Sequence, residues 1–163
     1  MHCKTFAALF SLLLFTPLFA QKVEPTYKQV AYGPHQDMVL NFWKIDSKKP
    51  TPLLVHIHGG GWLGGKKNET TSPNQMRNGY SYASIDYRLA GTELLPAAVH
   101  DAARAIQFLR TKAEEWNIDP KRIAVTGGSA GAASSMWLAY HDDLAEPKSK
   151  DPVLRQSSRV CGA

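Results

Sequence analysis

Ser129 lies in a glycine-rich pentapeptide, Gly127-Gly-Ser-Ala-Gly131, between an apolar β-branched run and a segment of small residues. This order predicts a strand, a sharp turn and a helix, and such a turn strains the serine backbone and lifts its hydroxyl clear of the sheet. Glycine is needed at 127 and 131 because side chains there would collide with the neighbouring strand and helix. Ser129 is therefore a candidate nucleophile for acyl transfer, although the same pentapeptide also occurs in turns with no chemical role.

A second glycine-rich turn could stabilise the charge that such a nucleophile creates. The apolar run 53–58 leads directly into Gly59-Gly-Gly-Trp62. Acyl transfer places negative charge on the carbonyl oxygen, and backbone N–H groups held about 2.7–3.1 Å from that oxygen stabilise it. Gly60 and Gly61 can supply two such groups, and Ala130, directly after the candidate nucleophile, can supply a third.

The motif His58-Gly-Gly-Gly-Trp62 and the pentapeptide around Ser129 together resemble the α/β-hydrolase superfamily. The similarity is to its esterases and lipases, namely the hormone-sensitive-lipase-like enzymes and the secreted feruloyl or carbohydrate esterase-like proteins. It implies hydrolysis of a small-molecule carboxylic ester, with acylated carbohydrates among the candidate substrates. It implies no cofactor, because a serine mechanism supplies its own nucleophile. It also implies that His58 braces the glycine loop and that Asp86, in Asp-Tyr-Arg-Leu, is structural.

The triad acid and histidine of this family come from loops well after the nucleophile. His141 follows Ser129 by about three helical turns, roughly 18 Å at about 1.5 Å per residue, so it cannot reach the hydroxyl. Asp142, Asp143 and Asp151 are equally misplaced, and none is assigned a catalytic role. We therefore expect the N-terminal portion of a longer esterase, ending after the helix that follows the nucleophile and inactive by itself.

Two other functions remain open on the sequence. One is a non-catalytic, hydrolase-like protein that binds an ester or a glycan without cleaving it. The other is a fragment of a serine peptidase of the prolyl-oligopeptidase type, which shares the nucleophile turn. The two motifs around Gly60 and Ser129 favour an esterase over a peptidase.

The elements that would position these residues alternate along the chain. Strands are expected at 27–32 and 38–43, joined as a hairpin with the second strand at a sheet edge, and at 53–58, 80–89 and 122–127. A helix after Pro96 should bury one apolar stripe, formed by Val99, Ala102, Ala103, Ile106, Leu109 and Ala113. This pattern predicts an α/β-hydrolase fold with a mostly parallel sheet and helices on both faces. Both glycine-rich turns then lie at the carboxyl ends of strands, where such sheets bind ligands.

The first twenty residues have the pattern of a secretory signal peptide. Lys4 precedes a largely apolar run from Phe6 to Ala20 that Pro17 interrupts near its end. The run is too short for a typical transmembrane helix, which needs about 20 apolar residues, so a retained anchor is the weaker alternative. We expect cleavage after Ala20, a partial hydrolase domain over 21–163 with no stable membrane span, and a secreted or periplasmic location.

Composition and the remaining titratable residues suggest no other ligand class. The formal charge is +5, but the basic residues are scattered, so nothing indicates nucleic acid or lipid. Cys161 would be alone after signal cleavage, so no intramolecular disulfide is expected. His56 and His58 point to one side of a strand, yet no third ligand follows at a useful spacing, and no metal site is predicted. His100 and Asp101 are expected at the surface or in salt bridges.

Overall fold

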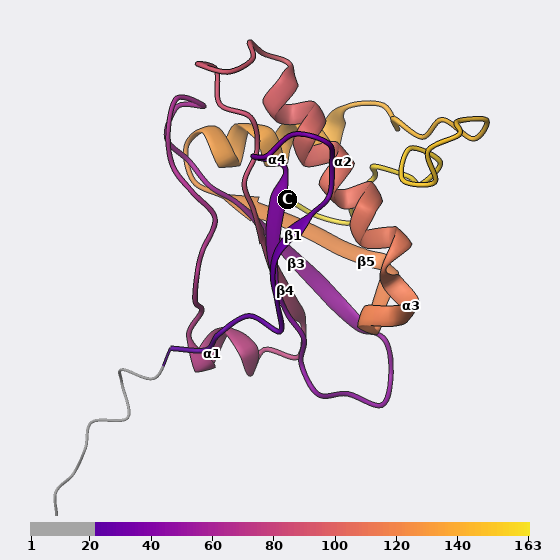
Figure 1. Cartoon of the computed structure of the whole chain (residues 1–163). Coiled ribbons are helices and arrows are strands. Elements are labelled where there is room, and N and C mark those ends of the chain that lie inside the picture. Colours follow the sequence, from indigo (N-terminus) through magenta and orange to yellow (C-terminus); the bar gives the residue numbers. More distant parts are fainter. Residues whose placement is uncertain (1–21) are drawn as a thin grey trace, which may run out of the picture.

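The computed structural model describes residues 22–163 (Figure 1). The predicted signal peptide, residues 1–20, lies outside the described residues. Within residues 22–163, no helix has both the length and the apolar character that crossing a bilayer requires.

Five strands form one mixed sheet in the order β1-β2-β4-β3-β5. β1 pairs with β2 and β2 with β4 in antiparallel fashion, whereas β3 is parallel to both β4 and β5. The central strands are rich in apolar and β-branched residues, which suits a sheet buried on both faces. The strands are β1 (Tyr27–Ala31), β2 (Val39–Trp43), β3 (Thr51–Ile57), β4 (Ser81–Ile85) and β5 (Ile118–Gly127).

Four helices accompany the sheet: α1 (Pro73–Met76), α2 (Ala97–Thr111), α3 (Ala113–Trp116) and α4 (Ala130–Tyr140). The long helices α2 and α4 contact each other and β5, so both cover the same face of the sheet, whereas the short α1 contacts β4 away from them (Figure 1). The predicted stripe on α2 is buried from Val99 to Leu109. Ala113 begins α3 after a break at Lys112, and it is partly buried against the same core.

The main hydrophobic core lies between the sheet and α2. Val55, Ile57 and Ile85 are fully buried there, together with Ala102 and Ile106 of α2. Each buried aliphatic side chain of this size contributes about 1.5–3 kcal/mol relative to an exposed one. This core fixes the carboxyl ends of β3 and β5 against the helix layer, so the turns that follow both strands have a rigid base.

The hairpin forms as predicted, but its second strand is not at an edge of the sheet. β2 lies between β1 and β4, and β1 is the outer strand. Phe42 packs in the core on one face, while Trp43 on the other face contacts Tyr82 and donates to the Val23 carbonyl. The alternation of β2 therefore reflects two covered faces. The prediction of an edge strand was wrong, because β4 pairs with the side of β2 that was expected to be open.

The second face of the sheet is covered by chain segments. Trp43 and Tyr82 lie on this face, and Val23 forms an isolated β-bridge with Thr71 beside them. Asn68 donates its backbone N–H to Ser84 and its side-chain amide to the Tyr82 hydroxyl. The side-chain amide of Asn68 is thus engaged inside the fold.

Beyond α4, the chain returns across α2 to the outer edge of β5. Gln107 donates to the carbonyl oxygens of Leu144 and Gln156, and Arg110 donates to that of Ser157. The chain then meets β5 through backbone hydrogen bonds at 161 and 162, with Ile123 and Val125 as their partners.

Candidate active site

Ser129 occupies a strained turn between β5 and α4. Its backbone has φ 55° and ψ −121°, a conformation that residues with a side chain rarely adopt. Strain of this kind costs of order 1–3 kcal/mol and persists only where the surrounding structure enforces it. The side chain is exposed, and within residues 22–163 its hydroxyl has no hydrogen-bond partner. The predicted strand, sharp turn and helix are all present.

Two glycines of the pentapeptide are required by close backbone packing. A Cβ at Gly127 would overlap the Ile57 carbonyl oxygen and lie 2.7 Å from the carbonyl carbon of Gly131. A Cβ at Gly131 would overlap the same Ile57 oxygen and lie 2.9 Å from the His58 oxygen. The start of α4 therefore lies directly against the end of β3. Gly128 differs, since a Cβ there would meet nothing within 4 Å.

The glycine loop after β3 adopts a backbone that favours glycine. Gly60 has φ 107° and Gly61 has φ 62°, and the loop turns back on itself because Leu63 and Gly64 both donate to the Gly60 carbonyl. In the described part of the chain, the N–H groups of Gly60, Gly61 and Ala130 donate to no protein group. All three predicted oxyanion donors are thus uncommitted.

The glycine loop and the nucleophile turn lie against each other. A Cβ at Gly59 would be 2.7 Å from the Gly128 carbonyl oxygen and 3.5 Å from the Ser129 Cβ. Trp62 Nε1 donates to Ser134 Oγ across 3.1 Å, and that hydroxyl donates to the Ala130 carbonyl. The parallel pairing of β3 with β5 places both turns at one sheet edge, as the sequence predicted.

His58 supports the glycine loop through contacts of its ring and its backbone carbonyl. Its Nδ1 lies 2.7 Å from the Gly59 carbonyl oxygen, and its ring stacks on Tyr87 with 4.2 Å between ring centres. The Tyr87 hydroxyl donates to the His58 carbonyl. Burial, together with the nearby Asp86 charge, raises the pKa of Tyr87 to about 12, so this phenol stays protonated and keeps donating at physiological pH.

Lys67 was not singled out by the sequence, yet it is a buried member of this region. Its ammonium Nζ lies 3.0 Å from Asp86 Oδ2, and only 2% of its side chain is exposed. Asp86 is therefore structural, as the resemblance implied. Nothing in the sequence separates Lys67 from the exposed Lys66 beside it, because both follow the same pair of glycines.

His56 faces the second side of the sheet and lies 3.2 Å from Ser84 Oγ. Among residues 22–163 no group of three or more His, Cys, Asp or Glu side chains is placed to hold a metal ion. Burial lowers the pKa of His56, and the nearby His58 adds to this effect. The folded protein thus favours the neutral form of His56.

This lowered pKa gives a prediction for stability. Just below the ordinary histidine pKa of about 6.5, the unfolded chain binds more protons at His56 than the folded chain does, so acid favours unfolding. The free energy of unfolding should fall from about pH 8 to about pH 5.5, and His56→Gln should make that fall smaller. Denaturant titrations at both pH values measure it, with the exposed His100→Gln as control. Equal falls in the wild type and His56→Gln would contradict the prediction.

The four late residues excluded from catalysis have other roles or none. His141 directly follows the last turn of α4 and stacks on Trp137. Asp143 accepts hydrogen bonds from Ser158. Burial raises the pKa of Asp143, but hydrogen bonding by Ser157, Ser158 and Ala145 outweighs this effect and lowers it overall. Asp151 pairs with Arg104 across 2.7 Å, and Asp142 is exposed. None of these side chains hydrogen-bonds Ser129.

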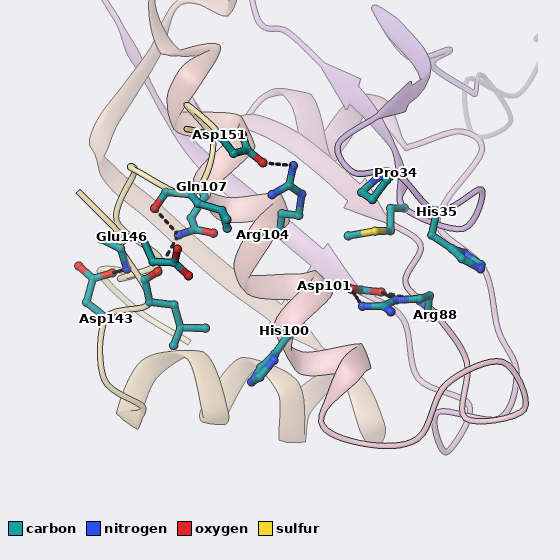
Figure 2. A pocket seen from close by; sticks show the side chains of 14 residues that line it. Pro34, His35, Arg88, His100, Asp101, Arg104, Gln107, Asp143, Glu146 and Asp151 are labelled. Carbon is teal, nitrogen blue, oxygen red and sulfur yellow. Dashed lines mark hydrogen bonds and ion pairs between the residues drawn. The ribbon is translucent and has the colours of Figure 1, made fainter. Parts of the chain in front are cut away.

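A hollow of about 860 Å³ lies elsewhere, between α2, the 33–38 turn and the 143–154 segment (Figure 2). Its main charges are already paired. Arg88 binds Asp101 through two side-chain hydrogen bonds, which raise the Arg88 pKa, and Arg104 binds Asp151. The predicted salt-bridge role of Asp101 is thus confirmed. Neither the nucleophile turn nor the glycine loop lines this hollow, so it is separate from the candidate active site.

Known proteins match this chain over most of its length. The BD-FAE family model matches residues 42–159. Carboxylesterase NlhH of Mycobacterium tuberculosis is 36% identical over 101 residues, which cover 60% of this chain and 32% of that protein. Esterase LipQ of the same organism is 31% identical over 144 residues, which cover 82% of this chain and 34% of that protein. The chain thus spans about a third of the length of these curated relatives.

Solved structures agree with these matches. An acetyl ester-xyloside bifunctional hydrolase from Caldicellulosiruptor lactoaceticus superposes with a TM-score of 0.67 at 28% identity, covering 89% of this chain and 56% of that one. Esterase 2 of Thermogutta terrifontis, phosphonylated by cyclosarin, superposes with a TM-score of 0.62 at 26% identity, covering 81% of this chain and 53% of that one. Since the family model also matches well over half of the chain, the protein belongs to the BD-FAE family of α/β-hydrolase esterases.

Proposed function

We propose that this chain carries the nucleophile and the oxyanion-binding groups of a serine carboxylic-ester hydrolase. Ser129 is the nucleophile, and the N–H groups of Gly60, Gly61 and Ala130 bind the oxyanion. The observation that carries the proposal is the juxtaposition of a strained, exposed serine with a loop whose N–H groups are uncommitted. Donors fixed in place before the reaction cost no reorganisation when charge develops on the substrate.

The proposed reaction has two half-reactions. Ser129 Oγ attacks the ester carbonyl carbon while a histidine takes the hydroxyl proton, and the tetrahedral oxyanion is held by the backbone donors. The alcohol leaves with the proton from that histidine, and Ser129 remains as an acyl ester. Water, deprotonated by the same base, then attacks the acyl carbon, and the carboxylic acid is released as Ser129 regains its proton.

The general base lies outside the described residues in this proposal. None of the histidines in residues 22–163 hydrogen-bonds the Ser129 hydroxyl, and His58, whose motif adjoins the site, binds the Gly59 carbonyl instead. A serine hydroxyl without a positioned base is protonated and weakly nucleophilic. We therefore assign the triad histidine and acid to parts of the protein outside residues 22–163.

The proposed substrates are small carboxylic esters, with acetylated carbohydrates as the first class to test. The support is the acetyl ester-xyloside hydrolase among the structural neighbours. Export through the N-terminal signal peptide is part of the same proposal, since a secreted enzyme would meet acylated polysaccharide fragments outside the cell. Its support is the charged and apolar pattern of residues 1–20.

Parallel assays on the full-length protein distinguish an esterase from the other functions. We expect p-nitrophenyl acetate and an acetylated xylo-oligosaccharide to be hydrolysed, and a proline p-nitroanilide peptide to be left intact. The ester and the anilide release chromophores that are read in one spectrophotometer, and released acetate reports the sugar ester. Turnover of the anilide would indicate a peptidase. Saturable binding of the sugar ester without release of acetate would indicate a non-catalytic binding protein, and either result would refute the proposal.

A further inference from the structure

Lys67 is a buried lysine in an otherwise polar, glycine-rich segment. Its side chain is 2% exposed, while the neighbouring Lys66 is exposed. Taking an ammonium group out of water is costly unless a carboxylate compensates for the lost hydration. The burial of one lysine of an adjacent pair therefore calls for a specific partner.

Asp86, directly after β4, is that partner, and it binds Lys67 twice. Asp86 Oδ2 lies 3.0 Å from Lys67 Nζ, and Asp86 Oδ1 accepts the backbone N–H of Lys67. Glu69, half-exposed, lies 3.2 Å from the same ammonium. The two bonds to Asp86 hold the end of the glycine loop near β4. The hydrogen bond from the Tyr87 hydroxyl to the His58 carbonyl holds the beginning of the loop.

Asp86 also faces His58, since its Oδ1 lies 3.7 Å from His58 Nε2. The opposite ring nitrogen of His58 lies 2.7 Å from the Gly59 carbonyl oxygen. A carbonyl oxygen can only accept a hydrogen bond, so Nδ1 carries the proton in this contact. Lys67 is thus bonded to Asp86, and His58 to the Gly59 carbonyl, while the Asp86 carboxylate lies near His58 Nε2 without a hydrogen bond between them.

The Gly59 carbonyl fixes the direction of one proposed oxyanion donor. A peptide group is planar and trans, so the C=O of Gly59 and the N–H of Gly60 belong to one rigid plane and point in opposite directions. A hydrogen bond that holds this carbonyl toward His58 therefore turns the Gly60 N–H away from His58. Gly60 has φ 107°, a conformation that glycine adopts without steric cost, so no side chain of its own fixes this peptide.

We propose that Lys67 is a positioning residue for the oxyanion loop, acting through Asp86 and His58 on the Gly59–Gly60 peptide. This inference rests on the proposed esterase function. Lys67 touches neither the substrate nor the reacting atoms. Its ammonium group neutralises the Asp86 carboxylate, and its backbone N–H holds the end of the loop at Asp86. His58 therefore keeps its Nδ1 proton directed at the Gly59 carbonyl.

Lysine variants of the full-length protein test this role by kinetics. Lys67→Met should lower kcat for p-nitrophenyl acetate about 10- to 100-fold and change KM less than about threefold, because a misdirected donor acts mainly in the transition state. Lys67→Arg, which keeps the charge, should restore most of kcat, and Lys66→Met should match the wild type. Lys67→Gln, which can still donate to Asp86, replaces the methionine variant if that one does not fold.

Nitrogen-15 spectroscopy of the His58 ring tests the same link without any substrate. The wild type and Lys66→Met should show a protected Nδ1–H resonance, and Lys67→Met should lose or broaden it. An unchanged resonance and a wild-type kcat in folded Lys67→Met would overturn the proposal. A wild type that hydrolyses no ester would refute the esterase function instead. The ring spectra would still decide whether Lys67 keeps the proton on His58 Nδ1.

Discussion

Ester turnover by the full-length protein should fall about a millionfold when Ser129 is replaced by alanine, because removal of the nucleophile eliminates the acyl-enzyme route. Residual hydrolysis through the oxyanion donors and substrate binding alone amounts to about 10³–10⁴ over water. Alanine carries the same Cβ as serine, so the strained backbone at φ 55° is no worse tolerated. We therefore expect an unchanged melting temperature together with the loss of turnover, as measured by steady-state kinetics and a thermal melt.

A matched control for this variant is Ser47→Ala. Ser47 is a serine of the loop that precedes β3, at the end of that strand opposite to the Ser129 turn. It should retain wild-type kcat and KM. Turnover by Ser129→Ala within tenfold of the wild type would assign the nucleophile to another residue.

Gly131→Ala should destabilise the fold by about 3 kcal/mol or more, the upper end of what overpacking a well-packed interior costs. The new Cβ would overlap the Ile57 carbonyl oxygen and lie 2.9 Å from that of His58. Both are backbone atoms of β3 or the residue after it, so no side-chain rotation can relieve the overlap. The start of α4 must then move away from β3. For a domain of this size the melting temperature should fall by roughly 6–12 °C.

Gly128→Ala is the matched control, since it adds the same methyl group three residues earlier in open space. Its melting temperature should remain within about 2 °C of the wild type. Equal stability of the two variants would show that α4 does not lie against β3 as closely as described.

Much of the fold and of the site could be predicted because local patterns encode them. The glycines at 127 and 131 indicate that two backbone segments approach closely. The structure shows that the segment they meet is the end of β3. The placement of both glycine-rich turns at one edge of the sheet followed from their positions, each directly after an apolar strand. The pairing of β3 with β5 then brings Ser129 beside the glycine loop, without any long-range signal in the sequence.

What could not be predicted depends on contacts between distant segments. The alternating pattern of β2 is compatible with an edge or an interior strand, and only its pairing with β4 decides between them. Lys66 and Lys67 are equivalent by local sequence, yet Asp86 lies within reach of only the second in the folded chain. The local sequence likewise does not indicate that Gln107 and Arg110 of α2 donate to carbonyl oxygens of the segment after α4.

Labelling with a serine-reactive phosphonate tests the central claim most directly. The probe forms a bond to the nucleophile and places an oxygen where the oxyanion donors act, and an esterase of similar fold is phosphonylated by cyclosarin. The full-length protein would be treated with the probe, digested and sequenced by mass spectrometry. We predict one adduct, on Ser129, that is absent from Ser129→Ala. An adduct on a different residue, or undiminished labelling of Ser129→Ala, would contradict the assignment of Ser129 as the nucleophile.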